Sequence, residues 1–372
     1  MQFNTAFRGR LALALAVVCF SQTAIAVETR HIDVTNGFYM VEGVNIRNGN
    51  FAVTFSHFED AGPGGIKFNR TYNSRSTHDG YFGKGWGSPF ETRLVAMPDG
   101  TVHVRENGTG SLTIYGEPNG SPEDGIDRIV ATAAMAKPMS DSERAKLTQA
   151  LVDDDDLQFD KIVALGVGFE VPEGTRLDAD RSTMFVSETC EDAYVKRSRQ
   201  LYWRHCDDVA EGFDKDGRIT RKHDGENDAY LDMAYRESRL QEVSLDDASL
   251  TFKWEGGHVV SVTDAAGKRF DFAYDARGNL KREATYGRSA DFAYDDRDNM
   301  TSITFIDTLK QEMTYDANNR TTSVTRRDGH KTRFEYQQDL ANSERQVTRV
   351  TQYASDGSVE AITVFDIHPA LD

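Results

Sequence analysis

A motif of about twenty residues recurs along the C-terminal half of this chain and constrains its fold more than any other feature. Four closely similar stretches contain Tyr274, Tyr294, Tyr315 and Tyr336, which follow one another at intervals of 20, 21 and 21 residues. Self-similarity at a fixed period of this length is typical of repeat architectures. The sequence therefore predicts a protein that uses one structural unit many times.

Each unit is expected to be one β-hairpin. Aromatic anchors recur every 19 to 22 residues; they are Phe213, Tyr235, Trp254, Tyr274, Tyr294, Tyr315 and Tyr336. One unit accommodates two strands of about seven residues and two turns. A single hairpin buries too little apolar surface to be stable, so neighbouring hairpins must share a core. We expect the anchors in that core, with the aromatic residue two positions earlier (Phe272 before Tyr274) on the same face.

A polar turn follows the anchors. In the clearest units an aspartate comes next, as Asp275, Asp295 and Asp316, and Gly278 stands three positions after the first of these. The aspartate can accept backbone N–H bonds within the turn, and glycine or asparagine tolerates positive φ. These residues are therefore predicted to be structural.

The N-terminus has the pattern of a secretory signal peptide. Arg8 and Arg10 precede an apolar run over residues 11–20, and Ala24-Ile25-Ala26 is a small-x-small cleavage site. We expect residues 1–26 to be removed and the mature chain to be exported. Its predicted location is the periplasm, the cell surface or the medium of a bacterium.

Two membrane-associated alternatives are less favoured. A lipid anchor on Cys19 would require a smaller residue than Val18 before it. The apolar run of the signal is too short to span a bilayer as a stable helix. Because no other long apolar run occurs, the mature protein is not expected to be integral to a membrane.

The charge of the chain bears on its partners. The formal net charge is −17 at pH 7. A chain this acidic is repelled by phosphate backbones, which argues against nucleic acid as a partner.

Two cysteines remain after the expected cleavage, and we predict a disulfide between Cys190 and Cys206. A zinc site would need more ligands than His205 supplies beside Cys206. The carboxylate run at residues 153–156 lacks the glycine bend of a calcium loop, and Asp214-Lys215-Asp216-Gly217 lacks the glutamate that such a loop needs at its twelfth position. No metal is therefore expected.

The remaining pattern predicts an all-β fold with a small helical insert. Residues 27–118 form an N-terminal β module, and residues 211–372 form a spiral or open sheet of hairpins. The insert, residues 119–210, begins within a linker or long loop at 117–125 and contains a short helix that Ser140 caps. A second short helix or strand is expected at residues 159–165.

The Tyr-Asp-x-x-Gly/Asn-x-Leu pattern resembles the YD repeat of Rhs proteins, teneurins and the shell subunits of insecticidal toxin complexes. The segments at 68–76 and 80–86 resemble the N-terminal module that precedes YD repeats in bacterial Rhs proteins. That second match is carried by Arg70, Tyr72, Ser74, Gly83, Gly85 and Trp86. A phosphate-binding loop, the alternative for these glycines, is disfavoured because neither Ser nor Thr follows Lys84. The resemblance implies hairpins that wind into a hollow shell around a toxic C-terminal domain.

This chain departs from that family pattern in two ways. About seven or eight units are present, fewer than a closed shell would need. We find neither an Asp-Pro self-cleavage segment nor a toxin domain after Tyr336. Encapsulation and autoproteolysis are therefore not expected here.

None of the common active-site motifs occurs in this sequence. Nucleophile-elbow, His-Glu-x-x-His and phosphate-loop patterns do not occur, and the nine histidines form no spaced cluster. We therefore expect no catalytic, cofactor-binding or metal-binding residues. The predicted function is a non-catalytic scaffold that binds another polypeptide (a toxin, immunity or envelope protein) or a surface glycan, with a sheet edge as the contact. Two alternatives stay open, which are a hydrolase site in residues 117–210 and a remnant of a larger Rhs toxin.

Overall fold

The protein is described from a computed structural model. The structure describes residues 27–33, 39–58, 66–152, 154–166, 169–184, 190–199, 201–207, 209–224, 229–338 and 345–368. The predicted signal peptide, residues 1–26, lies outside these ranges.

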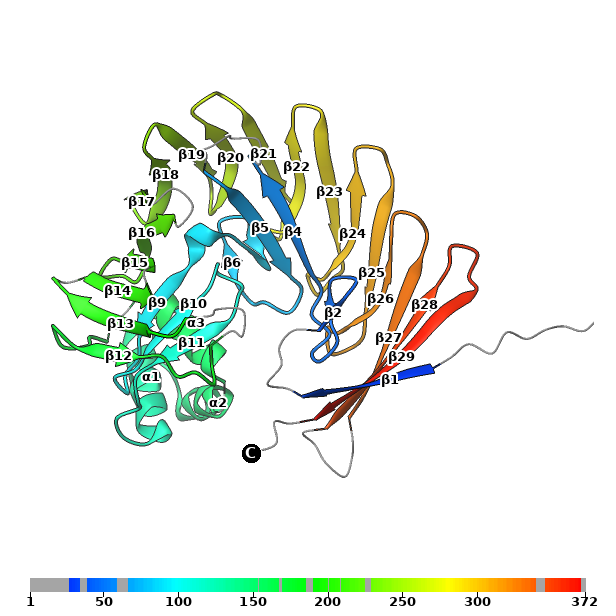
Figure 1. The fold of residues 1–372 in the computed structure, drawn as a ribbon. Helices are drawn as coiled ribbons and strands as arrows, with labels where there is room; N and C mark the ends of the chain where they lie inside the picture. The colour runs from blue at the N-terminus through cyan, green and yellow to red at the C-terminus, as the bar shows by residue number, and fades with distance from the viewer. Residues whose placement is uncertain are drawn as a thin grey trace, which may run out of the picture.

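One 19-stranded sheet makes up most of the described chain (Figure 1). Its strands from β12 to β29 pair in sequence order with antiparallel neighbours, and β1 (Val27–Asp33) pairs in parallel with β29. The strands are β12 (Arg176–Asp178), β13 (Ala193–Ser198), β14 (Leu201–Cys206), β15 (Val209–Phe213), β16 (Ile219–Asp224), β17 (Ala229–Arg236), β18 (Arg239–Leu245), β19 (Ala248–Glu255), β20 (His258–Asp264), β21 (Arg269–Tyr274), β22 (Leu280–Thr285), β23 (Arg288–Tyr294), β24 (Met300–Phe305), β25 (Lys310–Tyr315), β26 (Thr321–Thr325), β27 (Lys331–Gln338), β28 (Gln346–Tyr353) and β29 (Val359–His368). The predicted all-β fold with hairpin repeats is confirmed. We call the strands from β15 onward the array.

The N-terminal module lies inside the curve of the array (Figure 1). Its elements are β2 (Met40–Val41), β3 (Val44–Asn45), β4 (Ala52–His57), β5 (Phe68–Asn73), β6 (Asp79–Gly80), β7 (Gly83–Lys84), β8 (Trp86–Gly87), the 3-10 helix η2 (Pro89–Glu91), β9 (Arg93–Ala96), β10 (Val102–Arg105) and β11 (Leu112–Tyr115). The side chains of β5 alternate between buried and more exposed, as period-two strands do. Its buried side faces the array, where Phe68 meets Phe252 edge-on at a centroid distance of 6.1 Å.

The helical insert holds α1 (Pro122–Ala136), α2 (Asp141–Leu151) and α3 (Asp155–Leu165). Ser140 caps α2 as the sequence predicts. The predicted linker at 117–125 is wrong in its second half, because a capping box at Ser121 and a proline at the next position start α1 there. The helices share a small apolar core with β9, built from Val95, Met97, Ile126, Ile129, Val130, Leu151, Phe159 and Ile162.

The acidic run at residues 153–156 begins α3. Asp153 lies outside the described residues. The Asp154 carboxylate accepts a hydrogen bond from the Leu157 N–H at 2.8 Å, and the next two aspartates occupy the first helical turn. Carboxylates are favourable at that end of a helix because its N–H groups and dipole are positive. This gives the run a structural role.

The anchors lie at β-bulges that recur along the array. A β-bulge occurs at Trp254, Tyr274, Tyr294 and Tyr315. The polar end of most anchors donates to a main-chain carbonyl near the start of the preceding strand. These bonds are Tyr235 to Ile219 at 2.8 Å, Trp254 to Leu240 at 2.7 Å, Tyr274 to Val259 at 2.6 Å, Tyr315 to Met300 at 2.7 Å and Tyr336 to Thr321 at 2.7 Å. These hydrogen bonds from the anchor side chains fix the distance between successive strands.

The aspartates after the anchors close the turns. Asp275 Oδ1 accepts from the N–H groups of Arg277 and Asn279, at 2.8 and 2.9 Å. Asp295 and Asp316 accept equivalent pairs of bonds. The fourth turn position has a left-handed backbone, with φ of +87° at Gly278 and +65° and +58° at the equivalent Asp298 and Asn319. Only small or locally hydrogen-bonding side chains adopt this conformation readily.

Candidate binding site

The N-terminal module is fastened to the array by a buried ion pair. Arg70 on β5 is wholly buried, and its guanidinium forms a close pair with the Glu283 carboxylate on β22. The guanidinium carbon lies 4.9, 4.7 and 4.6 Å from the ring centroids of Phe82, Trp86 and Phe272. Each of these contacts combines cation–π attraction with packing. Arg70 therefore joins the two halves of the molecule in a dry environment.

His57 completes this cluster. Its Nε2 lies 3.2 Å from Glu283 Oε2, and both side chains are buried. Burial lowers the pKa of His57, so the imidazole is neutral at neutral pH. Burial is the largest single influence and raises the pKa of Glu283, but the charge of Arg70, the hydrogen bond with His57 and the charge of Arg288 together lower it below its ordinary value. The cluster holds one compensated pair of charges.

The other residues of the predicted N-terminal motif lie at this junction or support it. The Trp86 Nε1 donates to the Tyr294 hydroxyl at 3.1 Å, and the Met300 N–H donates to the Tyr72 hydroxyl at 2.9 Å. A side chain at Gly83 would collide with the Gly278 carbonyl of an array turn. Gly85 packs against the Tyr72 ring within the module, and Ser74 accepts from the Phe51 N–H at 2.9 Å. The motif thus brings module and array together.

The module also pairs with the array at a second buried ion cluster. Arg204 on β14 pairs with Glu106 of the β10–β11 turn and with Glu211 on β15. Lys222 Nζ lies 2.8 Å from the same Glu211 carboxylate. Burial would raise the pKa of Glu211, but the charges of Arg204 and Lys222 lower it to about 2.

Acid should weaken the fold through Glu211. Its folded pKa of about 2 lies below the ordinary 4.5, so its stabilisation is complete above pH 4.5 and is lost as the pH falls toward 2. Between pH 4.5 and 2, the free energy of unfolding of the unmodified protein should therefore fall by on the order of 2–3 kcal/mol more than that of Glu211→Gln. Urea denaturation at pH 7, 4.5 and 3 measures it. Glu283 titrates in the same direction in the unmodified protein and in the variant, so the difference between their free energies of unfolding isolates Glu211. If the two free energies fall in parallel as the pH is lowered, the prediction is contradicted.

The two cysteines lie at disulfide distance, with Cα atoms 5.4 Å apart. The pair joins Cys190 to the end of β14 at Cys206. The Asp207 carboxylate lies within 4.8 Å of both sulfurs and accepts from the N–H groups of Glu191 and Asp192 at 3.0 Å each. That carboxylate thus anchors the same loop.

Removing the disulfide should destabilise the protein measurably. The bridge closes a sequence separation of 16 residues, for which the loss of loop-closure entropy in the unfolded chain is worth about 3 kcal/mol. We expect Cys190→Ser/Cys206→Ser to lower the free energy of unfolding by about that amount. Thermal and urea unfolding with and without reductant measures it. Reductant should not change the free energy of unfolding of the double variant. If reductant lowers that free energy equally in the unmodified protein and in the variant, the disulfide is not the cause.

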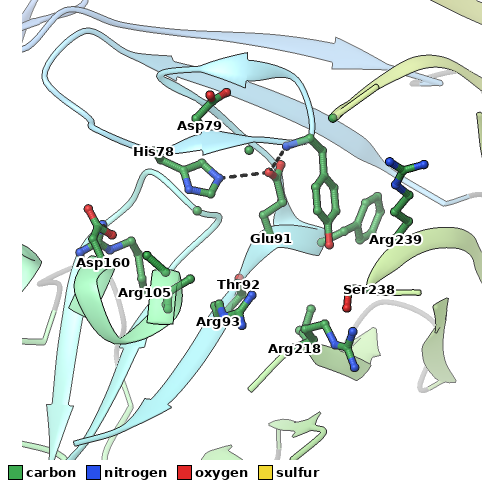
Figure 2. A pocket seen from close by; sticks show the side chains of 18 of the residues that line it. His78, Asp79, Glu91, Thr92, Arg93, Arg105, Asp160, Arg218, Ser238 and Arg239 are labelled. Atoms are coloured by element: carbon green, nitrogen blue, oxygen red, sulfur yellow. Dashed lines mark hydrogen bonds and ion pairs between the residues drawn. The ribbon is translucent and has the colours of Figure 1, made fainter. Parts of the chain in front are cut away.

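A half-open cavity of about 540 Å³ lies between the module, the helical insert and the array. Its wall is formed by the module around β6 and η2, by α3, and by the β17–β18 and β19–β20 hairpins of the array (Figure 2). The residues come from three distant parts of the chain, so no local sequence signal marks them. Two of the repeat anchors, Tyr235 and the predicted site residue Trp254, line it.

Three of the four carboxylates that line this cavity are held by neighbours, and the fourth, Glu237, is exposed. Glu91 accepts from the Tyr81 N–H at 2.7 Å and from Ser88 Oγ at 2.8 Å, and it lies 3.1 Å from His78 Nε2 (Figure 2). Asp160 accepts from Arg105 at 3.0 Å and from Thr77 at 2.8 Å. Asp79 lies 3.1 Å from His258 Nε2. These acids are therefore engaged in fixing the wall.

The arginines of the cavity differ in their partners. Arg218 pairs with Asp214 and Asp216 at 2.8 Å each. Arg93 donates to the Asp216 carbonyl at 3.1 Å, and Arg239 donates to the Gly256 carbonyl at 2.6 Å. Arg93 Nε is buried and has no hydrogen-bond partner in the part of the chain that the structure describes. Burial also lowers the pKa of Arg93.

None of the described helices is long and apolar enough to cross a bilayer.

Comparisons with known proteins agree with the repeat. The family model described as RHS Repeat matches residues 254–290, which include Trp254, Tyr274 and the Asp275 turn. A domain of unknown function, DUF6531, matches residues 42–112, which include Arg70 and Trp86. A comparison with curated proteins gives no match.

Several solved structures of toxin complexes also match. TcdB2–TccC3 without its hypervariable C-terminal region gives a TM-score of 0.25 at 11% identity, over 45% of this chain and 14% of that one. The Photorhabdus luminescens Tc holotoxin pore gives 0.24 at 10% identity, over 83% and 19%. TcdB2–TccC3 gives 0.23 at 12%, over 83% and 21%. The chain thus spans about a fifth or less of these structures, and the assignment rests on the two family models. With an RHS Repeat match at residues 254–290, a hairpin array and its N-terminal module, the chain is similar to Rhs, or YD-repeat, proteins.

Proposed function

We propose that the protein is an exported, non-catalytic scaffold that holds another polypeptide or a surface glycan outside the cytosol. The proposal rests on what covers the inner face of the array. The chain's own N-terminal module occupies it, fastened there by Arg70 and Glu283. The residues that recur with the repeat build strands and turns, and a rigid wall of this kind is suited to presenting a surface.

One end of the sheet, at β12, is covered and limits where a partner can bind. At β12, the Gly116 N–H donates to the Asp178 carbonyl and the Asp180 N–H donates to the Ile114 carbonyl, both at 2.8 Å. The module thereby covers that edge and leaves it unsuited to strand addition. We therefore place the contact on the exposed surfaces and in the cavity of Figure 2.

The insert supports the scaffold over the hydrolase alternative. Its three helices bury a continuous apolar cluster against β9. It contributes Asp160 to the cavity, and that carboxylate is engaged by Arg105 and Thr77. A general acid or base needs a carboxylate that can reach a substrate proton. The geometry therefore favours a structural insert.

Export itself is proposed from the signal-peptide pattern and from the Cys190–Cys206 pair, since disulfides persist in oxidising compartments. The test expresses the full chain with a C-terminal tag, sequences the N-terminus of the exported protein and captures its partners by cross-linking. We expect an N-terminus at Val27 and either one polypeptide encoded nearby or an envelope glycan. The same tagged chain in unfolded form serves as the control for nonspecific capture. Retention in the cytosol, or capture of neither class, would overturn the proposal.

A further inference from the structure

We propose that the outer tips of the array form a docking surface for a bilayer that contains anionic phospholipids. The outer tips are the turns at residues 264–269, 285–288, 305–310 and 325–331, which connect β20 to β21, β22 to β23, β24 to β25 and β26 to β27. They lie at the outer ends of the hairpins, along the convex rim of the array (Figure 1). This inference goes beyond the scaffold function and does not depend on which partner the scaffold holds.

Three large apolar side chains are exposed on two neighbouring outer tips. Tyr286 is fully exposed, and Ile306 and Leu309 are 60% and 48% exposed. Ala290 of β23 pairs with Phe305 of β24, so the two tips begin at nearly the same level of the sheet. Since neighbouring strands lie about 5 Å apart, the three side chains share one small area of the rim. Single exposed apolar residues are ordinary on protein surfaces, but a group of them marks an interaction site.

The turns themselves do not require these apolar residues. The Thr308 N–H donates to the Phe305 carbonyl at 2.9 Å, and the tips at 264–269 and 325–331 close by the equivalent bond at 3.0 Å. The residues that those two tips carry at the positions of Ile306 and Leu309 are small or polar, namely Ala265 and Lys268 in one and Arg327 and His330 in the other. An exposed isoleucine or leucine adds nothing to the core. These side chains are therefore available to a surface outside the protein.

The outer tips are basic, although the chain as a whole is acidic. They contain seven lysines and arginines and three aspartates, whereas the formal net charge of the chain is −17 at pH 7. Each of the four strands that lead away from the tips begins with an exposed cation; these are Arg269, Arg288, Lys310 and Lys331. The basic stretch ends at the turns on either side, which contain Asp246, Asp247 and Asp356.

The aspartates of the outer tips are engaged. The Asp264 carboxylate accepts from the Lys268 N–H at 2.8 Å, Asp307 pairs with Arg327, and Asp328 pairs with Arg326 at 2.8 Å.

Several of the cations have no carboxylate partner. Among the described residues, Lys268, Lys310 and Lys331 form no ion pair, and Arg288 donates to the Ser56 carbonyl at 3.1 Å. Glu312, two residues after Lys310, is exposed and forms no ion pair with a described residue either. Even with this acid counted, positive charge remains in excess, so the charge of the outer tips complements an anionic surface.

The shape of the rim favours a bilayer over a folded protein. A stable protein interface buries about 800 Å² on each partner and needs continuous complementary surface. The outer tips are instead separate points on a convex rim (Figure 1). A bilayer accepts side chains one at a time, with tyrosine at the headgroups, isoleucine and leucine at the acyl boundary, and lysine and arginine beside anionic lipids. Nucleic acid would match the charge but would offer no acyl layer to Ile306 and Leu309.

Flotation of the purified chain with lipid vesicles tests the proposal. The probes are vesicles of phosphatidylcholine mixed with phosphatidylglycerol and vesicles of phosphatidylcholine alone. We expect the mixed vesicles to bind at least about 10-fold more tightly at low ionic strength, because each cation near an anionic surface adds attraction. Added salt should weaken this binding. Equal affinity for the two kinds of vesicle, or no flotation with mixed vesicles at millimolar lipid, would overturn the proposal.

An apolar variant locates the contact. Tyr286→Ser/Ile306→Ser/Leu309→Ser should weaken binding to the mixed vesicles about 10-fold or more, because the burial of apolar surface is lost. The matched control is Met135→Ser/Val152→Ser, which removes exposed apolar side chains from the helical insert. Urea denaturation confirms that both variants fold. Unchanged affinity in the triple variant, or an equal loss in the control, would overturn the assignment to the outer tips.

A charge variant tests the basic residues. Lys310→Gln/Lys331→Gln should weaken binding to the mixed vesicles about 10-fold or more at low ionic strength. Lys281→Gln/Arg282→Gln serves as the control, because these exposed cations lie on β22 near the opposite end of the hairpin. An equal loss in the control would contradict a localised contact.

A fluorescent label separates insertion from adsorption by charge alone. An environment-sensitive dye on Ile306→Cys should brighten when vesicles bind, whereas the same dye on Met135→Cys should not, because Met135 lies on α1 of the insert. No change at Ile306, or an equal change at both sites, would overturn insertion by the tips. Capture of a soluble polypeptide by the tips in place of vesicles would overturn the bilayer as the occupant, while partner capture by the whole chain tests the scaffold separately.

Discussion

Replacing Arg70 with alanine is expected to lower the free energy of unfolding by about 3–5 kcal/mol. The substitution leaves Glu283 buried at 3% side-chain exposure with its main counter-charge gone. An unpaired buried carboxylate is strongly unfavourable, and the contacts of the guanidinium with Phe82, Trp86 and Phe272 are lost as well. Because the pair joins the module to the array, both parts should loosen together.

Urea denaturation monitored by tryptophan fluorescence measures this effect, since Trp86 lies beside Arg70. The control is Arg282→Met, one residue before Glu283 on the same strand, where an exposed pair with Asp291 is worth less than about 1 kcal/mol. Arg70→Met/Glu283→Met should recover much of the loss, because replacing both charges removes the uncompensated carboxylate. If Arg70→Ala costs no more than Arg282→Met, the junction is not held by this pair.

The repeat could be predicted from sequence because its causes are local. An aspartate such as Asp275 closes its turn on residues two and four positions later, so the pattern is visible within five residues. The period of the tyrosines reflects one hairpin after another. The fold class and the helix that Ser140 caps follow from the same kind of short-range signal.

The module–array junction could not be predicted in this way. Arg70 and Glu283 are 213 residues apart, and in the sequence Glu283 is one polar residue among several on a strand. The cavity likewise combines Arg93 with the β17–β18 turn and α3. Only the three-dimensional arrangement brings these groups together. Helix α1 is hard to predict for a different reason, because its Pro- and Gly-containing start resembles a loop.

Tyr294→Ala is expected to cost about 3–5 kcal/mol, as a large truncation in the core does. Tyr294 packs against the buried core at the bulge of β23, with its ring 6.2 Å from that of Tyr72. It differs from the other anchors in its polar contact. Its hydroxyl accepts from the Nε1 of the fully buried Trp86, whereas the Tyr315 hydroxyl donates to the Met300 carbonyl. Tyr294 therefore belongs both to the array and to the junction with the module.

The two tyrosines separate these roles when only the hydroxyl is removed. Tyr315→Phe should cost about 0.5–1.5 kcal/mol, the usual net value of one hydrogen bond. Tyr294→Phe should cost more, about 1–3 kcal/mol, because it leaves the Trp86 N–H buried without an acceptor. Urea denaturation of both variants, with a Trp86→Phe/Tyr294→Phe cycle, measures the coupling. Equal costs for the two hydroxyls would contradict a special role of the Trp86 contact. A near-silent Tyr294→Ala would place Tyr294 at the surface, where an aromatic row every twenty residues would be free to bind a ligand.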